Sequence, residues 1–265
     1  MAVERRGAAI EIIGLRKEYS SGPDRVVALD DITLRIAPGE FVCIVGPSGC
    51  GKSTLLRILA GLTAQTGGTI KVEATGWAVE NAMVFQESGL FPWMSVEANV
   101  GFGLMTRGIP TDEAAARVEA ALKLVGLTRF RRHYPHQLSG GMRQRSAIAR
   151  AFVTDPGMLL MDEPLAALDA QNRVILQAEL VRIWEQTRKT VIYITHSIEE
   201  ALLLGDRTVV MTAHPGRIKQ IIDVPFPRPR NLMTLSASPK FGRLKLDIWR
   251  VLEEEVMRAR AEEEA

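Results

Sequence analysis

The stretch Gly46-Pro-Ser-Gly-Cys-Gly-Lys-Ser-Thr54 decides the fold. It fits G-x-x-x-x-G-K-[ST], the pattern of a loop that cradles phosphate. The apolar run Phe41–Val45 precedes it, as a buried parallel strand requires, and apolar residues recur at helical spacing from Leu55 to Leu62. A strand, a glycine-rich turn and a helix N-terminus together form an anion site, because backbone N–H groups and the helix dipole attract phosphate oxygens. We therefore expect a nucleoside triphosphate to bind here.

Each residue type in this loop suits contact with phosphate. Its three glycines let the backbone approach closely and take positive φ without steric cost. Lys52 is expected to bind the β- and γ-phosphates, and the Ser53 hydroxyl is a predicted ligand of Mg²⁺. The alternative is a chance match in an ordinary glycine-rich turn, and the flanking strand and helix argue against it. The predicted nucleotide-binding residues of the loop are Gly46, Pro47, Ser48, Gly49, Cys50, Gly51, Lys52, Ser53 and Thr54.

Composition narrows the class of protein. The chain has 265 residues, 46% of them hydrophobic, which is enough for a large core. A net charge of +2 does not indicate a nucleic-acid partner. The first ten residues lack the apolar core of a secretory signal, and no stretch approaches 18 consecutive apolar residues, so no membrane span is expected. Cys43 and Cys50 are badly placed for a disulfide framework, which favours the reducing cytoplasm.

Strands alternate with helices along most of the chain, which predicts an α/β fold with a parallel sheet covered on both faces. The expected strands of this sheet are 41–45, 83–85, 157–161, 190–194 and 208–211. Antiparallel strands are expected near the N-terminus at 9–15, 26–36, 67–72 and 77–79. Helices are expected at 95–105, 112–125 (with Thr111 as its N-cap), 170–186, from 197, and from Ser238-Pro239 onwards.

These elements predict one domain over residues 1–265 with three parts. The α/β core covers residues 1–88 and 157–222, and a mainly helical subdomain is inserted at 89–156. The proline-rich segment 225–230 cannot continue a sheet and is interpreted as a linker. It opens a C-terminal extension over residues 223–265, whose charged end is expected to be solvated.

Two carboxylates follow the predicted strand at 157–161. Ligands of open α/β sheets bind at the carboxyl ends of the strands, so Asp162 is placed to hold Mg²⁺. Glu163 points in another direction because side chains alternate along a strand, so it can address the attacking water. An acidic pair at a strand end is commonly only a solvated turn, but the phosphate loop favours the functional reading.

A second candidate anion site lies at Leu138-Ser-Gly-Gly-Met-Arg-Gln-Arg145. Ser139 is a good N-cap residue, and the two glycines after it expose backbone N–H groups at a helix start. Alone, this pattern is more typical of an ordinary glycine-rich helix cap, because such caps are frequent.

Over nearly its whole length the chain resembles ATP-binding-cassette (ABC) ATPases. The motifs that carry the resemblance stand in the family's order: 46–54, Gln86, 138–142, 158–163, 165–169 and His196. The Leu-Ser-Gly-Gly segment is highly specific to that family. The resemblance implies a phosphate-loop ATPase core with an inserted helical subdomain, ATP and Mg²⁺ as its ligands, and a head-to-tail dimer of two copies.

The resemblance also implies a role for each matching residue. Ser139, Gly140, Gly141 and Met142 of one copy would contact the γ-phosphate bound by Lys52 of the other, and Asp169 would bridge the two sites. Gln86 would sense Mg²⁺ and the attacking water, His196 would contact the γ-phosphate, and Tyr19 would stack on adenine. Met142 stands where Gln is commoner, and Ala166 where Ser or Gly is usual. The other histidines, His133, His136 and His214, match nothing and are expected at the surface.

A lone cassette resembles the importer type, in which membrane permeases are separate chains and a solute-binding protein delivers the solute. Residues 138–145, the loop 85–93 and the segment 225–230 are similar to the nitrate, sulfonate and taurine branch. Such a subunit would lie at the cytoplasmic face of the inner membrane. Leu90, Phe91 and Trp93 form an apolar patch that is expected to receive a permease helix.

Other solutes, such as bicarbonate, cyanate or a riboflavin precursor, are compatible with the same motifs. The alternatives of another class are a cassette acting on ribosomes or DNA and a regulatory module without turnover. The first usually carries two cassettes or a long coiled-coil insert, and Glu163 and His196 argue against the second.

Overall fold

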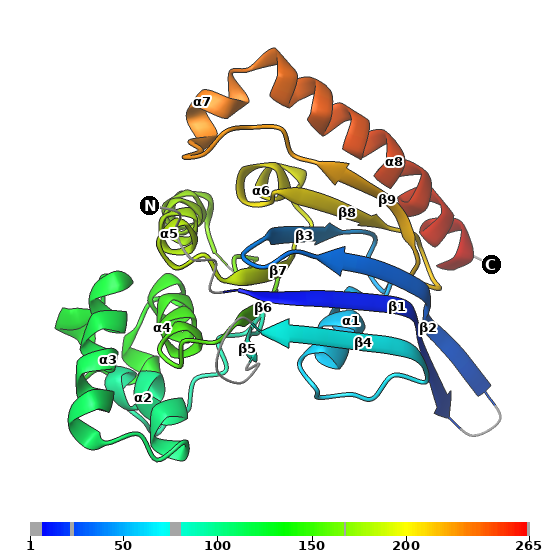
Figure 1. The fold of residues 1–265 in the computed structure, drawn as a ribbon. Helices are drawn as coiled ribbons and strands as arrows, with labels where there is room; N and C mark the ends of the chain where they lie inside the picture. Colours follow the sequence, from blue (N-terminus) through cyan, green and yellow to red (C-terminus); the bar gives the residue numbers. More distant parts are fainter. Residues whose placement is uncertain (1–6, 22–23, 75–80, 167, 264–265) are drawn as a thin grey trace.

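A computed structural model describes residues 7–21, 24–74, 81–166 and 168–263. In this part of the chain, two sheets and a group of helices pack together (Figure 1). The larger sheet has the order β5-β6-β7-β3-β8-β9, in which the first five strands are parallel and β9 is antiparallel to β8. Its strands are β5 (Asn81–Val84), β6 (Met158–Asp162), β7 (Thr190–Ile194), β3 (Phe41–Val45), β8 (Arg207–Met211) and β9 (Ile218–Asp223).

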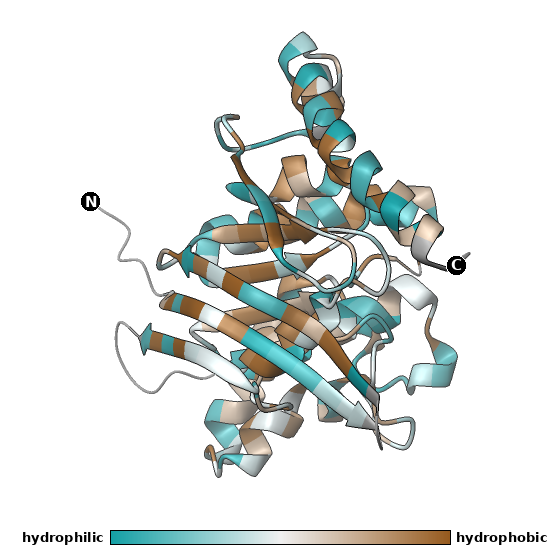
Figure 2. Cartoon of the chain, turned by 90° about the vertical axis from the view of Figure 1, so that its right-hand side faces the viewer, coloured by the Kyte–Doolittle hydropathy of each residue, from teal (hydrophilic) through white to brown (hydrophobic). Residues whose placement is uncertain are grey.

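The smaller sheet is antiparallel and has the order β2-β1-β4. Ile10 of β1 is paired with Ile36 of β2 on one side and with Val72 of β4 on the other. Hydrophobic and hydrophilic bands alternate along these strands, as expected for a sheet with one buried face (Figure 2). The three strands are β1 (Ala8–Ser21), β2 (Asp24–Ile36) and β4 (Gly67–Ala74).

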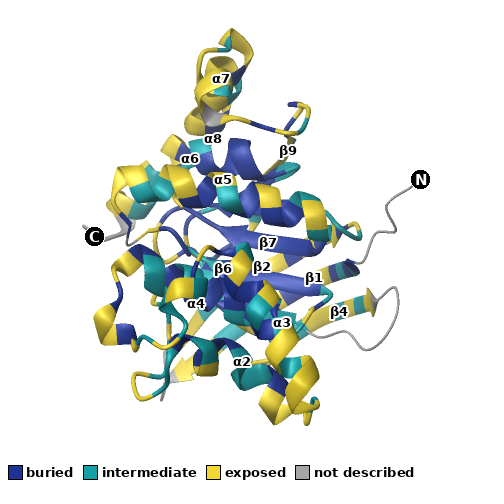
Figure 3. Cartoon of the chain, turned by 90° about the vertical axis from the view of Figure 1, so that its left-hand side faces the viewer, coloured by how far each residue is buried: buried dark blue, intermediate teal, exposed yellow. Residues whose placement is uncertain are grey.

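The parallel sheet is buried on both faces because its side chains alternate between two hydrophobic clusters. Val42 and Ile44 of β3 pack in one cluster with α1 and the small sheet, whereas Phe41, Cys43 and Val45 pack in the other with α4, α5 and α6. The parallel strands are dark with buried residues beneath helices whose outer faces are exposed (Figure 3). The covering helices are α1 (Lys52–Leu59), α4 (Gly140–Phe152), α5 (Ala170–Thr187) and α6 (Ile198–Leu204).

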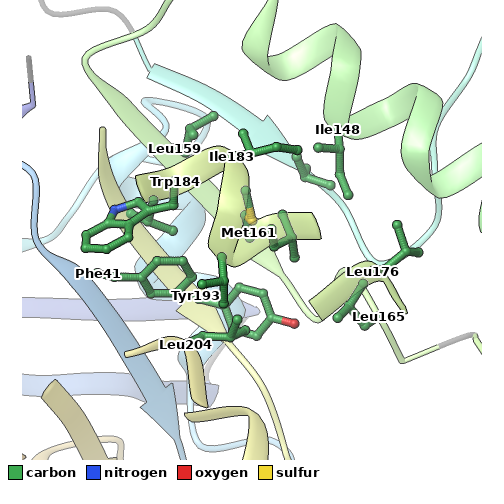
Figure 4. Packing of buried hydrophobic residues seen from close by; sticks show 14 of the residues in the cluster. Phe41, Ile148, Leu159, Met161, Leu165, Leu176, Ile183, Trp184, Tyr193 and Leu204 are labelled. Atoms are coloured by element: carbon green, nitrogen blue, oxygen red, sulfur yellow. The ribbon is translucent and has the colours of Figure 1, made fainter. Parts of the chain in front are cut away.

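Aromatic side chains fill the middle of the second cluster. Phe41 contacts Trp184 edge-on at 5.8 Å between ring centroids, and Tyr193 at the same distance (Figure 4). Each fully buried large apolar side chain contributes about 1.5–3 kcal/mol relative to an exposed one. This packing fixes β3 and β7 side by side. β3 ends at the phosphate loop, and β7 ends at Ile194, two residues before His196.

The helical layer beside the core and the C-terminal part complete the structure. α2 (Val96–Thr106) and α3 (Thr111–Leu124) pack with α4 on one side of the large sheet. Two short helices, η1 (Thr128–Phe130) and η2 (Pro135–Gln137), lie in the connection from α3 to α4. After β9, α7 (Leu232–Ser236) leads into α8 (Pro239–Glu263), which lies across α6 and β8. No helix in the described ranges is long and apolar enough to cross a membrane.

The structure confirms the predicted α/β class, with its parallel sheet, antiparallel N-terminal strands and inserted helices, and corrects several details. Thr111 is not an N-cap, since Pro110 holds that position in an extended conformation and Thr111 is already helical. Leu62 is 61% exposed because α1 ends at Leu59. The strand β9 at Ile218–Asp223 was not expected, because edge strands carry a weak hydrophobic pattern. The expected strand at 77–79 lies outside the described residues.

The segment 225–230, interpreted as a linker from its prolines, is packed against the core. Phe226 is buried, and the buried guanidinium of Arg230 donates hydrogen bonds to carbonyl groups at the end of α6, among them Leu202 and Gly205. Burial lowers the pKa of Arg230 to about 10. The carbonyls of a helix C-terminus need such donors, so this arginine attaches the C-terminal part to the core.

Candidate functional site

The phosphate loop connects β3 to α1, as predicted. Gly51 is the N-cap of α1 with φ of 92°, and a Cβ atom at this position would lie 2.7 Å from the Ala28 carbonyl oxygen. Only glycine fits both the backbone conformation and the space. The α1 N-terminus therefore presents its free N–H groups beside the loop, where they can bind an anion.

Lys52 lies inside this loop. Its side chain is buried, and its Nζ donates hydrogen bonds to the carbonyl oxygens of Gly46 at 2.9 Å and Pro47 at 2.7 Å. Both acceptors are neutral, so phosphate oxygens would offer the ammonium group a stronger partner. Burial raises the pKa of the neighbouring Cys50 thiol although Lys52 opposes the shift, so this cysteine is a poor nucleophile.

Two oxygen ligands suited to Mg²⁺ meet beside the loop. The Ser53 hydroxyl donates to Asp162 Oδ1 at 3.1 Å, although the two residues are 109 positions apart. Mg²⁺ prefers hard oxygen ligands and usually keeps one or two protein groups together with water and substrate phosphates. The chemistry of this pair fits such an ion.

Glu163 and His196 come together from adjacent strands. Asp162 is paired with Ile194 in the β6–β7 register, so the residues that follow the two strands face each other. The His196 Nε2 lies 2.6 Å from Glu163 Oε1. Glu163 has a left-handed backbone with φ of 46°, and its N–H donates to the Ile194 carbonyl. Such strain in a residue other than glycine is concentrated at functional sites.

The segment before His196 is fixed by a buried carboxylate, Glu200. This group accepts hydrogen bonds from Thr195 Oγ1 at 2.6 Å, from the Tyr193 hydroxyl at 3.1 Å and from Gln177 Nε2 at 3.1 Å. Burial, and after it the nearby Glu200 carboxylate, raises the pKa of the Tyr193 hydroxyl well above its usual value, so that group stays a hydrogen-bond donor. The imidazole of His196 is therefore presented from a rigid base.

These groups surround a pocket of about 340 Å³. A larger cavity of about 1170 Å³ lies at the amino ends of the parallel strands, but its charged residues largely pair with one another and it has no phosphate loop. We therefore place the site at the smaller pocket. Its lining contains the loop, Glu163 and His196, and three residues that the sequence did not indicate: Val26, Ala28 and His214.

Tyr19 is adjacent to this pocket without lining it. Its Cα is paired with that of Val26, which lines the pocket, and directly opposed residues of antiparallel strands share a face. The ring is 41% exposed, with the Lys17 ammonium group 4.6 Å from its centroid. Stacking of Tyr19 on adenine stays a prediction that this placement allows.

Ser139, Gly140, Gly141, Met142 and Asp169 form a second group outside the pocket. Ser139 caps α4 by accepting from the Met142 N–H, as expected, and Asp169 caps α5 by accepting from the Asn172 N–H. The hydrogen bonds from Asn172 lower the pKa of Asp169. A Cβ on Gly141 would lie 3.8 Å from Asn172, so the two helix starts are neighbours. None of the residues in this group lines the pocket beside the phosphate loop of its own chain.

Gln86 and the loop that follows it do not line the pocket. Gln86 is exposed after the end of β5 and does not line the pocket, so its contact with Mg²⁺ stays a prediction. Leu90 packs against the core and Phe91 is half-buried against Phe102, whereas Trp93 is 70% exposed. The apolar patch expected in this loop is therefore mainly Trp93.

Comparison with known proteins agrees with the motifs. The ABC transporter family model matches residues 29–166. An uncharacterized ABC transporter ATP-binding protein of Methanocaldococcus jannaschii is 45% identical over 97% of this chain and 96% of its own. The taurine import ATP-binding protein TauB of Jannaschia sp. is 44% identical over 95% and 97%. A solved dimeric ATP-binding cassette, in a post-hydrolysis state with ADP and Pi, has a TM-score of 0.72 and 31% identity, covering 82% of this chain and 100% of that one.

The site predicts that binding and chemistry can be separated by mutation. Lys52→Ala removes the cation beside the phosphates, so both nucleotide affinity and turnover should fall. His196→Ala removes a group beside Glu163 and should lower kcat by about 100-fold with little loss of affinity. Equilibrium binding of a fluorescent ATP analogue and steady-state phosphate release measure the two effects. Equal losses of affinity in both variants would contradict these roles.

Proposed function

Since this chain belongs to the ABC transporter family, we propose that it is the ATP-hydrolysing subunit of an importer and that its solute is a small molecule carrying a sulfonate group, such as taurine. ATP binding and hydrolysis follow from the family. The observation that carries the catalytic assignment is the meeting of Lys52, the Ser53–Asp162 pair and the Glu163–His196 pair around one pocket. The solute rests on taurine import proteins 43–44% identical over 95% of this chain.

The geometry supports a role for each group in hydrolysis. Lys52 and the N–H groups at the start of α1 bind the β- and γ-phosphates. Glu163 orients a water molecule and accepts its proton as the water oxygen bonds to the γ-phosphorus. The bond from that phosphorus to the bridging oxygen breaks, and ADP and phosphate leave. His196 donates a hydrogen bond to the γ-phosphate, and Mg²⁺ bound by Ser53 and Asp162 would neutralise phosphate charge.

The group formed by the N-termini of α4 and α5 supports action as a dimer. Ser139 and the glycines after it lie outside the pocket of their own chain, yet they present an N-capped helix start suited to phosphate. We propose that they complete the site of a second copy, with Asp169 between the two sites. A solved cassette of the family is dimeric after hydrolysis.

A dimer that closes on ATP should accumulate when hydrolysis is blocked. Glu163→Gln removes the proton acceptor, so hydrolysis should slow by about 100- to 10,000-fold while ATP still binds. Light scattering should then show the variant as a dimer with ATP and a monomer with ADP. Ser139→Arg in the same background is the matched control and should stay monomeric. A Glu163→Gln variant that binds ATP as a monomer would contradict the shared site.

The exposed ring of Trp93 supports a membrane partner. The loop carrying it is held by Asn99, which bonds the Phe91 backbone in both directions, and by Arg150, which donates to the Ser88 and Gly89 carbonyls. A rigid loop that exposes a large aromatic ring is typical of a docking site. We propose that a permease subunit docks here at the cytoplasmic face of the inner membrane, with a separate solute-binding protein delivering the solute.

Trp93→Ser should therefore separate ATPase activity from transport. The isolated subunit should keep its basal hydrolysis, because Trp93 is not among the residues that line the pocket. Co-purification with the permease and solute uptake should both be lost. Trp249→Ser, at a tryptophan of α8 that is 45% exposed, is the control and should keep both. Early thermal unfolding and loss of basal hydrolysis in Trp93→Ser would instead show that this ring is structural.

The solute itself is tested by reconstitution. The subunit is placed in proteoliposomes with any permease and solute-binding protein found encoded beside it, and ATP-driven uptake of labelled taurine, nitrate and bicarbonate is compared. Preferential uptake of taurine supports the sulfonate assignment. Uptake of another solute keeps the importer and replaces the solute, and a chain that never associates with the permease contradicts the importer.

A further inference from the structure

The loop 212–217, which joins β8 to β9, is pressed against the phosphate loop. The Gly216 N–H donates to the Ala28 carbonyl at 3.1 Å, and the Gly216 carbonyl accepts from Asp30 N–H at 3.0 Å. A Cβ on Gly216 would lie 2.0 Å from the Cys50 carbonyl oxygen. No residue with a side chain fits at this contact. The loop 212–217 is therefore packed directly on both β2 and the phosphate loop, and it cannot shift without disturbing them.

This loop places His214 at the pocket. The side chain is exposed and lines the pocket together with Val26 and Ala28 of β2. Tyr19 is paired with Val26, so this part of the wall lies at the end of the pocket next to Tyr19. Glu163 and His196, by contrast, belong to the ends of β6 and β7. A neutral or protonated imidazole has an N–H that can donate to a ribose hydroxyl or a phosphate oxygen.

The loop is held from the other side by the C-terminal helix. Glu255 of α8 is only 2% exposed, and it accepts hydrogen bonds from the Ala213 N–H at 2.8 Å and from Lys219 Nζ at 2.7 Å. Burial by itself raises the pKa of Glu255, but the hydrogen bonds from Lys219 and Ala213 outweigh it and lower the pKa. The carboxylate therefore stays charged, and Ala213 is directly bonded to α8 one residue before His214.

The helix is itself firmly attached to the core. Phe241, Ile248 and Leu252 of α8 are buried in the large hydrophobic cluster. Glu254, the residue beside Glu255, is 73% exposed and contacts Lys219 but not the backbone of the loop. The two adjacent glutamates both contact Lys219, but Glu255 alone of the pair is buried and accepts a hydrogen bond from Ala213.

We propose that His214 contacts the nucleoside end of bound ATP and that Glu255 is a positioning residue which holds His214 there, so that the C-terminal helix sets nucleotide affinity. This inference rests on the proposed placement of ATP in the pocket. The nucleoside end is common to ATP and ADP, so the proposed His214 contact is made equally with both. Glu255 acts only through the loop 212–217.

Nucleotide dissociation constants of the full chain test the assignment. One hydrogen bond contributes about 0.5–1.5 kcal/mol, so His214→Ala should weaken binding of Mg-ATP and Mg-ADP alike by about three- to tenfold. Glu255→Ala should weaken both nucleotides by a similar factor or less, and Glu254→Ala should change neither. Circular dichroism and thermal unfolding check that each variant is folded, and Glu255→Leu, which fills the space without an acceptor, replaces Glu255→Ala if the latter is not folded.

A double-mutant cycle separates positioning from general stability. If Glu255 acts through His214, the Glu255 substitution should cause no further loss of affinity once His214 is alanine. Additive losses, or unchanged affinity in the folded His214→Ala variant, overturn the proposal while the wild-type chain still binds ATP. A wild-type chain that binds no ATP would instead contradict the proposed function.

Discussion

The buried ammonium group of Lys52 is the charge on which the rest of the site depends. Its hydrogen bonds go to two neutral carbonyls of the phosphate loop, and no carboxylate of the described residues forms an ion pair with it. A buried charge without an opposite charge is costly, so the loop strongly favours an anionic ligand. The N-terminus of α1 adds partial positive charge at the same place. The fold must therefore deliver β3, the loop and α1 in one rigid unit.

The parallel sheet delivers every other group to the same edge. The phosphate loop follows β3, Asp162 ends β6, His196 follows β7 and His214 follows β8. Carboxyl ends of parallel strands meet at one edge, so residues far apart in the sequence become neighbours. The register decides which residues meet: a slip of one position between β6 and β7 would turn Asp162 away from Ser53.

Capped helix starts connect this edge to the surfaces where partners are proposed to bind. Ser139, Asp169 and Ser197 each accept a hydrogen bond from the backbone three residues later. Arg173 of α5 donates to the Leu168 carbonyl beside Asp169 and lies 4.0 Å from the buried Glu200, which holds the segment before His196. The segment proposed to bridge two copies is thus tied to the proposed catalytic histidine through one carboxylate.

The sequence alone determined those features whose physical cause is local. A glycine-rich loop between an apolar run and a helical pattern identifies a phosphate site, and Ser139 is recognisable as an N-cap because its bond to Met142 lies within one helical turn. Tertiary structure decided which distant segments meet. It placed His196 on Glu163, brought His214 into the pocket and buried Glu255 against Ala213. Strand order and packing set these contacts. They join residues far apart in the sequence, 42 positions in the case of Ala213 and Glu255, so no short sequence pattern predicts them.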